Sequence, residues 1–315
     1  MHTTMITGAT GFIGRHVAEE ARSRGVPLRL MSRRPRPVPA GTARTGSRPV
    51  QEVVADLARP ESLRGTCEGV DVLLHCASQI GGADDVNEAV NARGTAALVA
   101  EAERAGVRRV VYLSTASVYG RGTFRSAGPE GLERRPGSPT SRTRAVAEDV
   151  VRAAGGIVLR PHLVYGTGDT WVVPAMAWLL RALSGASAGW HARMSAVAAP
   201  ELARLVMGVG SAPAGRLTAS VYHAAHPRPV TAADLLRAVS GCMELPPAHG
   251  RMSLGEARER LTAASLPLHA LDMLATDHWF DSAPLWADLD QTPGPGFDSD
   301  FAESREWYRR VVRAA

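Results

Sequence analysis

The sequence predicts an α/β fold in which a doubly wound parallel sheet is followed by a smaller, mostly helical C-terminal lobe. In the first half of the chain, short β-branched segments alternate with helical segments, an order typical of parallel strands covered by helices on both faces. After residue 165 this alternation stops, and all six tryptophans follow among short helical segments and turns rich in proline and glycine. We therefore expect two lobes, residues 1–165 and 166–315.

The individual elements follow from local patterns. Strands are predicted at residues 3–7, 27–31, 52–55, 71–76, 108–114 and 156–160. Helices are predicted over 12–24, 95–105, 231–240 and 253–265, and another begins near Pro139. Gly25 and Gly106 follow the first two helices, where glycine is typical of a left-handed cap.

Composition indicates a soluble protein of the cytoplasm. The chain has 315 residues, of which 45% are hydrophobic, so it can bury a core. Its three cysteines, Cys67, Cys76 and Cys242, form neither an even disulfide set nor a metal-ligand pattern. The apolar segment 172–180 is too short to span a bilayer, and the N-terminus does not resemble a signal peptide.

The charge of the chain gives little reason to expect a nucleic-acid partner. The 36 basic residues, all of them arginine, are interspersed with 31 acidic residues, and the net charge is only +5. No recognition helix or aromatic-basic module is apparent. We expect a solvated basic surface, with neither nucleic acid nor membrane as partner.

The segment "ITGATGFIGRHVAEEA" (6–21) contains a glycine-rich turn between a predicted strand and a predicted helix. Gly8 permits the tight exit from the strand, Gly11 lets the backbone approach a pyrophosphate, and Gly14 allows the helix to pack closely on the strand. Free N–H groups at the start of the helix then face the anion. This pattern indicates a dinucleotide-binding Rossmann-type domain, and we assign residues 1–165 to it.

Two arginines follow the second predicted strand, in the segment "MSRR" (31–34). An NAD site favours a carboxylate here, whereas arginine suits the 2′-phosphate of NADP. Arg33 and Arg34 therefore predict NADPH/NADP as the cofactor. The alternative is a solvated basic loop, because Arg36, Arg44 and Arg48 continue the same charge and residues 15–48 hold nine arginines but only two acidic residues.

Several further motifs resemble those of the extended short-chain dehydrogenases/reductases. They are "TGATGFIG" (7–14), "ADL" (55–57), "HCAS" (75–78), "NARGT" (91–95), "STASVYG" (114–120) and "LRPHLVYGTGD" (159–169). The resemblance is specific over residues 1–169 and implies an oxidoreductase with a substrate-binding lobe over 166–315. The cofactor-binding residues predicted from the turn, the arginines and the resemblance are Gly8, Thr10, Gly11, Phe12, Ile13, Gly14, Arg33, Arg34, Asp56, Leu57, Cys76, Ala77, Ser78, Asn91, Ser114, Arg144, Pro161 and His162.

The chain departs from this family at the residues that transfer the proton. In the family, a tyrosine donates a proton to the developing alkoxide, and a lysine four residues later lowers the pKa of that tyrosine. Here Thr140 and Arg144 occupy these positions, and the chain contains no lysine. Thr115 matches the family's carbonyl-orienting residue, and Ser117 lies beside it. We therefore predict Thr115, Ser117, Thr140 and Arg144 as the catalytic set; the alternative for Thr115 is a strand-end hydroxyl bonded to backbone.

The loss of the proton donor is compatible with catalysis. An aliphatic hydroxyl is a far weaker acid than a phenol, and arginine does not release its proton in a protein. Losing a general acid costs roughly 10²- to 10⁴-fold in rate, or about 3–5 kcal/mol. Orientation of the reactants alone contributes on the order of 7–11 kcal/mol. The reaction therefore remains feasible if the substrate or a water supplies the proton.

Two functions fit these features. The first is a ketoreductase acting on an aromatic polyketide of the angucyclinone type in antibiotic biosynthesis, whose own hydroxyl groups polarise the ketone; tryptophans of the second lobe then either wall the ring system or pack in the core. The second is a non-catalytic NADP-binding sensor or scaffold. An epimerase or dehydratase fits less well, because both normally need the missing proton donor or base.

Two features leave alternatives open. His162 either relays a proton or contributes only its backbone to the cofactor. A homodimer is possible through the predicted helices 84–105 and 139–154, as in relatives.

Overall fold

The computed structural model describes residues 2–35, 50–183, 190–243 and 252–314. Its largest sheet has seven parallel strands in the order β11-β7-β5-β4-β1-β2-β3, which contains the strand order of the Rossmann fold. The strands are β1 (Thr4–Thr7), β2 (Leu28–Ser32), β3 (Val50–Val54), β4 (Val72–His75), β5 (Arg109–Leu113), β7 (Ile157–Arg160) and β11 (Val221–His223). The predicted fold class is confirmed, and each predicted strand lies within a few residues of an observed one.

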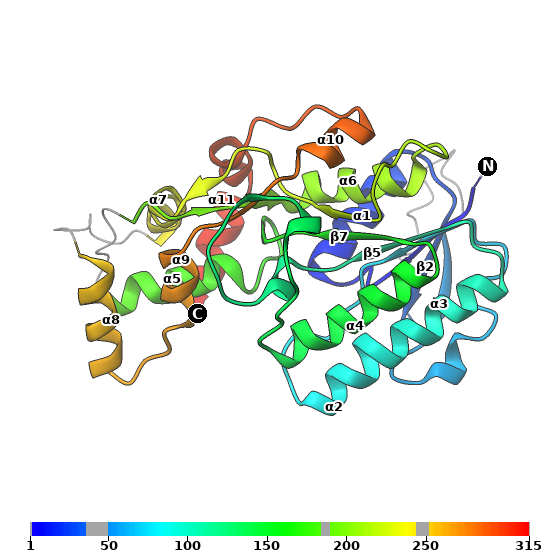
Figure 1. Ribbon diagram of the computed structural model, residues 1–315, viewed down its shortest axis with the longest axis horizontal. Coiled ribbons are helices and arrows are strands. Elements are labelled where there is room, and N and C mark those ends of the chain that lie inside the picture. The colour runs from blue at the N-terminus through cyan, green and yellow to red at the C-terminus, as the bar shows by residue number, and fades with distance from the viewer. Residues whose placement is uncertain (1, 36–49, 184–189, 244–251, 315) are drawn as a thin grey trace.

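Helices cover both faces of this sheet (Figure 1). One face carries α1 (Phe12–Ser23) and α6 (Ala199–Ser211), which pack against Ile6, Leu30 and Leu74. The other carries α3 (Gly94–Arg104) and α4 (Pro139–Ala153). Apolar side chains on both faces explain why several strands are largely apolar and do not alternate between apolar and polar residues.

The predicted helix 84–105 is interrupted by a wider turn. It is composed of α2 (Asp84–Asn87), the π-helix η2 (Glu88–Arg93) and α3. Such π turns inside helices occur frequently at functional sites. Gly94 begins α3 where a Cβ atom would lie 2.5 Å from the carbonyl oxygen of Leu57, so only glycine permits this close approach.

The second lobe is mostly helical, with its own apolar core around Trp190, Met194 and Phe301. Its helices are α5 (Val172–Ala182), α7 (Ala232–Met243), α8 (Leu254–Ala263), α9 (His269–Ala275) and α11 (Phe297–Ala314). A four-stranded sheet joins β12 (Val230–Thr231), β9 (Arg193–Met194), β13 (His278–Phe280) and β6 (Phe124–Ala127). The remaining elements are the paired strands β8 (Leu163–Tyr165) and β10 (Ala196–Ala198), the helix α10 (Ala283–Leu289) and the 3-10 turns η1 (Pro60–Leu63), η3 (Ala116–Tyr119) and η4 (Pro129–Gly131).

The chain crosses between the lobes more than once. α6 and β11 follow residue 165, yet they complete the helical cover and the edge of the large sheet. Conversely, β6 precedes residue 165 and pairs with β13 of the second lobe. The boundary at residue 165 therefore stays a proposal about where the main chain leaves the nucleotide-type domain.

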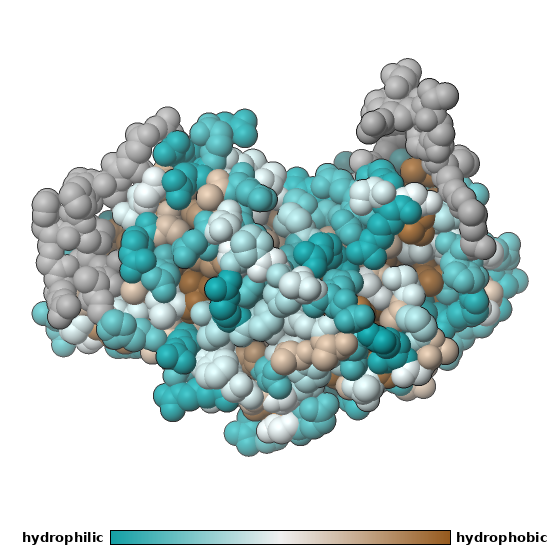
Figure 2. Space-filling view, turned by 90° about the horizontal axis from the view of Figure 1, so that it is seen from above, coloured by the Kyte–Doolittle hydropathy of each residue, from teal (hydrophilic) through white to brown (hydrophobic). Residues whose placement is uncertain are grey.

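The described segments contain no helix long and apolar enough to pass through a bilayer. The face seen in Figure 2 is mostly hydrophilic, and its hydrophobic side chains are scattered in small groups.

Candidate active site

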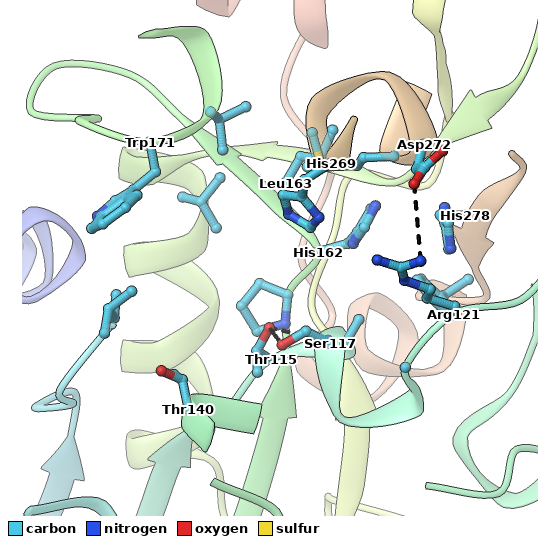
Figure 3. Close-up of a pocket in the computed structure, with 18 of the residues that line it drawn as sticks. Thr115, Ser117, Arg121, Thr140, His162, Leu163, Trp171, His269, Asp272 and His278 are labelled. Atoms are coloured by element: carbon cyan, nitrogen blue, oxygen red, sulfur yellow. Dashed lines mark hydrogen bonds and ion pairs between the residues drawn. The ribbon is translucent and has the colours of Figure 1, made fainter. Parts of the chain in front are cut away.

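Two cavities meet at the carboxyl ends of the central strands. The first, here called the nucleotide cleft, has a volume of about 530 Å³; the second, called the pocket, has about 780 Å³ and lies toward the second lobe (Figure 3). Thirteen of the predicted cofactor residues line the nucleotide cleft: Gly8, Thr10, Gly11, Phe12, Ile13, Gly14, Arg33, Asp56, Leu57, Cys76, Ala77, Ser78 and Arg144. Phe12, Ile13 and Arg144 also line the pocket, so the two cavities share a boundary.

The glycine turn forms a cradle in which Gly8 and Gly14 leave no room for a side chain. Gly8 has φ +71°, and a Cβ atom on it would lie 2.7 Å from the amide nitrogen of Ala77. A Cβ atom on Gly14 would lie 2.1 Å from the carbonyl oxygen of Gly8. Gly11 is the N-cap of α1, so the free N–H groups of this helix face the cleft. This geometry fits the pyrophosphate of a dinucleotide.

The two arginines after β2 differ in position. Arg33 lines the nucleotide cleft beside Met31 and Ser32, whereas Arg34 does not line it. The hydroxyl of Ser32 donates to the carbonyl oxygen of Arg34 and so fixes the turn between them. The prediction for the basic loop also named Arg36, Arg44 and Arg48, which lie outside the described residues.

Buried polar contacts hold the floor of the cleft. The ring of His75 bridges the hydroxyls of Thr7, at 2.7 Å, and Thr95, at 2.9 Å. Burial lowers the pKa of His75 to about 3, and the positive charge of Arg144 adds to this effect. His75 is therefore a neutral structural bridge. Burial likewise raises the pKa of the Cys76 thiol to about 12, so this cysteine is not a thiolate.

Thr115 and Ser117 lie together on the pocket wall (Figure 3). Thr115 is the N-cap of η3 and accepts a hydrogen bond from the backbone N–H of Ser117 at 3.2 Å. The two hydroxyl oxygens are 3.0 Å apart. Thr115 therefore caps a turn, as the alternative interpretation expected, while its side chain still lines the pocket, where it can orient a carbonyl.

The hydroxyl of Thr140 also lines the pocket, but its hydrogen is already used. It donates to the amide oxygen of Asn87 at 2.9 Å and accepts from the N–H of Gly81 at 3.1 Å. Asn87 is buried in α2 and also donates to the carbonyl oxygen of Gly81. Thr140 thus ties α4 to the loop after β4. Sequence reasoning missed Asn87, because nothing in the local pattern connects it with Thr140.

Arg144 lies one helical turn after Thr140, at the boundary of the two cavities. Its side chain is 9% exposed, and its guanidinium donates to the carbonyl oxygen of Leu113 at the end of β5. It lies 6.0 Å from the centre of the Tyr112 ring. Its Nε is buried without a hydrogen-bond partner among the described residues.

The hydroxyl of Ser114 points toward a buried cluster of charged side chains. It donates to Glu148 at 2.5 Å, and Glu148 also pairs with Arg160 and Arg134. Arg160 in turn donates to the hydroxyl of Tyr119 at 2.7 Å. This cluster joins α4 to β5 and β7 directly beneath the pocket. Ser114 lines the pocket and not the nucleotide cleft, and its role in cofactor binding stays a prediction.

Asn91 has a structural task as well. Its amide contacts both the N–H and the carbonyl oxygen of Gln79, at 2.7 and 3.0 Å, and donates to Thr143 at 3.1 Å. It is 2% exposed and lines neither cavity. Asn91 therefore positions the loop that borders the cleft, and direct contact with the cofactor stays a prediction.

His162 and Pro161 line the pocket rather than the cleft. The His162 ring packs against His278 and Phe280, with centroids 5.5 and 5.7 Å apart. Its Nε2 is buried without a partner in the described part of the chain. Burial lowers the pKa of His162 to about 3, and the adjacent His278 and His223 contribute. His162 is therefore neutral at physiological pH and can offer a hydrogen bond but no imidazolium proton.

Trp171 is the tryptophan that borders both cavities. Its side chain is 58% exposed, whereas Trp190 and Trp286 are buried in the cores. Asp169 holds the backbone of this segment by accepting from the N–H groups of Trp171 and Val172, each at 2.8 Å. Of the six tryptophans, Trp171 is the one in the described lining of these two cavities.

The described lining of the pocket contains no tyrosine, lysine or glutamate. The hydroxyl of Tyr119 is bonded to His223 and Arg160, and that of Tyr165 contacts Asp300. Arg121, Arg258 and Asp272 form the wall farthest from the cleft; the sequence offered no signal for this group, because its members come from three separate segments.

The fold, the glycine cradle and the shared boundary of the two cavities define a dinucleotide-binding α/β protein. Residues 4–187 match the NAD dependent epimerase/dehydratase family, and the chain belongs to this family.

Curated relatives match over part of their length. The chain is 32% identical over 185 residues to "Sterol demethylase protein B" of Methylococcus capsulatus, covering 53% of each protein. It is 29% identical over 187 residues to the "4-hydroxy-2-methyl-3-oxo-4-farnesyl-3,4-dihydroquinoline-1-oxide ketoreductase" of Stigmatella aurantiaca, covering 56% of this chain and 55% of that protein. The match to this chain thus spans about half the length of these relatives.

Solved structures resemble the whole chain in fold. MoeE5 in complex with UDP-glucose and NAD superposes with a TM-score of 0.72 at 23% identity, and the match covers 98% of this chain and 99% of that one. At this identity the likeness concerns the fold alone.

Proposed function

We propose that this protein is an NADPH-dependent ketoreductase of the cytoplasm that reduces a carbonyl of an aromatic polyketide, with the proton supplied by the substrate or by water. The observation that carries the proposal is the position of Arg144 at the boundary between the nucleotide cleft and the pocket, with Thr140 in the lining of the pocket. A ketone bound there lies beside the cofactor's site. The proposal accords with the name of the Stigmatella relative, a ketoreductase.

The residues present fit a nicotinamide dinucleotide. Gly8, Gly11 and Gly14 form its pyrophosphate cradle, and Arg33 is available for a 2′-phosphate. The bound cofactor supplies the hydride. Arg144 places its fixed positive charge where the carbonyl oxygen becomes negative, and Thr115 orients that oxygen.

The proton is proposed to come from outside the protein. The hydroxyl of Thr140 already donates a hydrogen bond to the amide oxygen of Asn87, and burial holds His162 neutral. A hydroxyl group peri to the ketone both polarises the carbonyl and delivers the proton. Trp171 provides a flat wall for the fused rings of such a substrate. We propose that the ketone is of the angucyclinone type and belongs to an antibiotic pathway. The reason is that a reductase with neither the catalytic tyrosine nor the lysine resembles the angucyclinone ketoreductase of simocyclinone biosynthesis.

Turnover tests this proposal. The protein is incubated with NADPH and either a peri-hydroxylated aromatic ketone or the same ketone without the hydroxyl, and loss of nicotinamide absorbance is followed. Rapid oxidation with only the hydroxylated ketone is expected. Equal rates with both ketones would contradict substrate assistance. Tight NADP binding without turnover of any ketone would instead favour a sensor or scaffold.

A homodimer through α2, α3 and α4 is also proposed. Val86 on α2 and Val146 on α4 are 41% and 48% exposed, which is consistent with a partner covering this side.

A further inference from the structure

The end of the pocket opposite the nucleotide cleft is built from charged residues of both lobes. Arg121 follows η3 of the nucleotide-type domain, Arg258 lies on α8 and Asp272 on α9. In Figure 3, Arg121 and Asp272 lie across the pocket from Trp171 and Thr140, with His162 between them. A ligand whose ketone reaches Thr115 therefore extends its remote end toward this group.

The positive charge of this group exceeds its negative charge. Arg258 donates to one oxygen of Asp272, while Arg121 lies 3.9 Å from the other, which is longer than a hydrogen bond. Two guanidinium groups thus share a single carboxylate. The side chain of Arg121 is 86% exposed, so most of its donors can turn toward a ligand.

The rest of the pocket does not compensate for this excess. The other acid in its described lining is Asp169, whose two oxygens accept the N–H groups of Trp171, Val172 and Val173 at the start of α5. The third arginine, Arg144, belongs to the boundary with the cleft. Between the two ends the wall is largely apolar, formed by Leu163, Val164, Val172, Met273 and Phe280. The lining thus suits a flat apolar body with an acid at its far end.

We propose that Arg121 and Arg258 bind an anionic group, a carboxylate or an ionised phenol, on the substrate at the end remote from the reacting ketone. This inference rests on the proposed ketoreductase function and narrows its substrate class. A guanidinium binds a carboxylate through two parallel N–H donors, which gives both attraction and orientation. His269, in the same lining, is a further polar neighbour for this group. The anion therefore sets how far the ring system enters and which carbonyl reaches Thr115.

Binding of a matched ligand pair tests the proposal without turnover. A dihydroxyanthraquinone and the same compound bearing one ring carboxylate are titrated into the NADP-saturated protein by calorimetry. The carboxylated ligand is expected to bind about 10-fold more tightly. Arg258→Gln and, independently, Arg121→Gln should reduce this preference to about 2-fold or less and leave the uncharged ligand unaffected. Arg237→Gln, an exposed arginine on α7 that does not line the pocket, is the matched control.

The outcomes separate the two proposals. Equal affinity of the wild type for both ligands, or a preference that survives both substitutions, overturns the anion site and leaves the ketoreductase proposal standing. Binding of neither ligand overturns the anion site together with the aromatic substrate class. A preference that disappears in both variants, in a protein that oxidises no NADPH with any ketone, supports the anion site and contradicts only the reductase activity.

Discussion

The hydroxyl of Thr140 donates its hydrogen to the amide oxygen of Asn87 at 2.9 Å, although its side chain borders the pocket. Asn87 is buried and holds the loop after β4 through the carbonyl oxygen of Gly81. Thr140, at the position where the sequence predicts the family's proton donor, thus joins a helix to a loop.

Thr140→Tyr should not restore a protein proton donor. No lysine exists in the chain to lower the pKa of the new phenol, and the bond to Asn87 would be lost. We expect kcat with a peri-hydroxylated ketone to change by less than about 3-fold or to fall. Stopped-flow measurement of NADPH oxidation gives this value. A gain of about 100-fold would show that the pocket still accepts an acid from the protein.

Arg144→Met should lower kcat by about 10²- to 10³-fold, because a fixed positive charge beside the developing alkoxide is removed. Methionine keeps much of the buried volume of the arginine side chain. We therefore expect only a small change in the thermal midpoint of unfolding, in contrast to the large change in kcat. Arg142→Met is the matched control: it lies on the exposed side of α4 and pairs with Asp84. Equal kcat for both variants and the wild type would exclude an electrostatic role for Arg144.

His162→Gln should reduce turnover by less than about 10-fold and leave the shape of the pH profile unchanged. Burial lowers the pKa of His162 to about 3, so its ring is uncharged as the pH rises from acidic to neutral values and cannot be the source of a titration there. Initial rates are measured across this range for both proteins. If the variant loses all turnover while its affinity for NADPH is intact, the proton passes through His162 and the substrate-assisted mechanism is wrong.

Arg33→Ala should weaken NADPH binding about 10-fold or more and leave NADH binding nearly unchanged, because a 2′-phosphate loses its guanidinium partner. Arg34→Ala is the natural comparison, since Arg34 does not line the cleft. Fluorescence titration with each cofactor measures both effects. Equal losses for NADPH in the two variants would indicate a general basic surface instead of a specific phosphate contact.

Acid should destabilise the fold through its buried histidines. Burial lowers the pKa of His75 and His162 to about 3 and that of His223 to about 4. Below about pH 6.5 the unfolded chain takes up protons that the native protein does not, so the free energy of unfolding falls as the pH falls. Each such histidine contributes up to about 1.4 kcal/mol per pH unit until its native pKa is reached. Urea unfolding at several pH values measures this slope, and His162→Gln should make it shallower; an unchanged slope would show that His162 takes up a proton in the native state.

Local patterns predicted most of the first lobe. The three glycines, the strand that precedes them and the arginines after β2 are close in sequence, and their chemistry depends on neighbours within a few residues. Both Arg33 and Arg34 were predicted to bind the cofactor, and only Arg33 lines the cleft. Nothing local distinguished the two, because the direction of each side chain is set by how the turn after β2 packs.

The second lobe was harder to anticipate. The sequence shows six tryptophans in this lobe but does not distinguish among them. Trp190 lies in the core and Trp171 borders both cavities, a difference that only packing decides. The pocket's far wall joins Arg121 of the first lobe with Arg258 and Asp272 of the second, so no periodicity could reveal it.

The sequence by itself determined the dinucleotide fold, the glycine turn and the lack of any lysine, since these depend on residue identity and short spacing. Only the tertiary structure decided that Thr140 donates a hydrogen bond to Asn87 and that Ser114 donates one to the buried carboxylate of Glu148. It also placed Arg144 at the boundary between two cavities. The physical reason is that a hydrogen bond or a charge acts on whatever lies within a few ångströms, and the fold brings those partners together from distant parts of the chain.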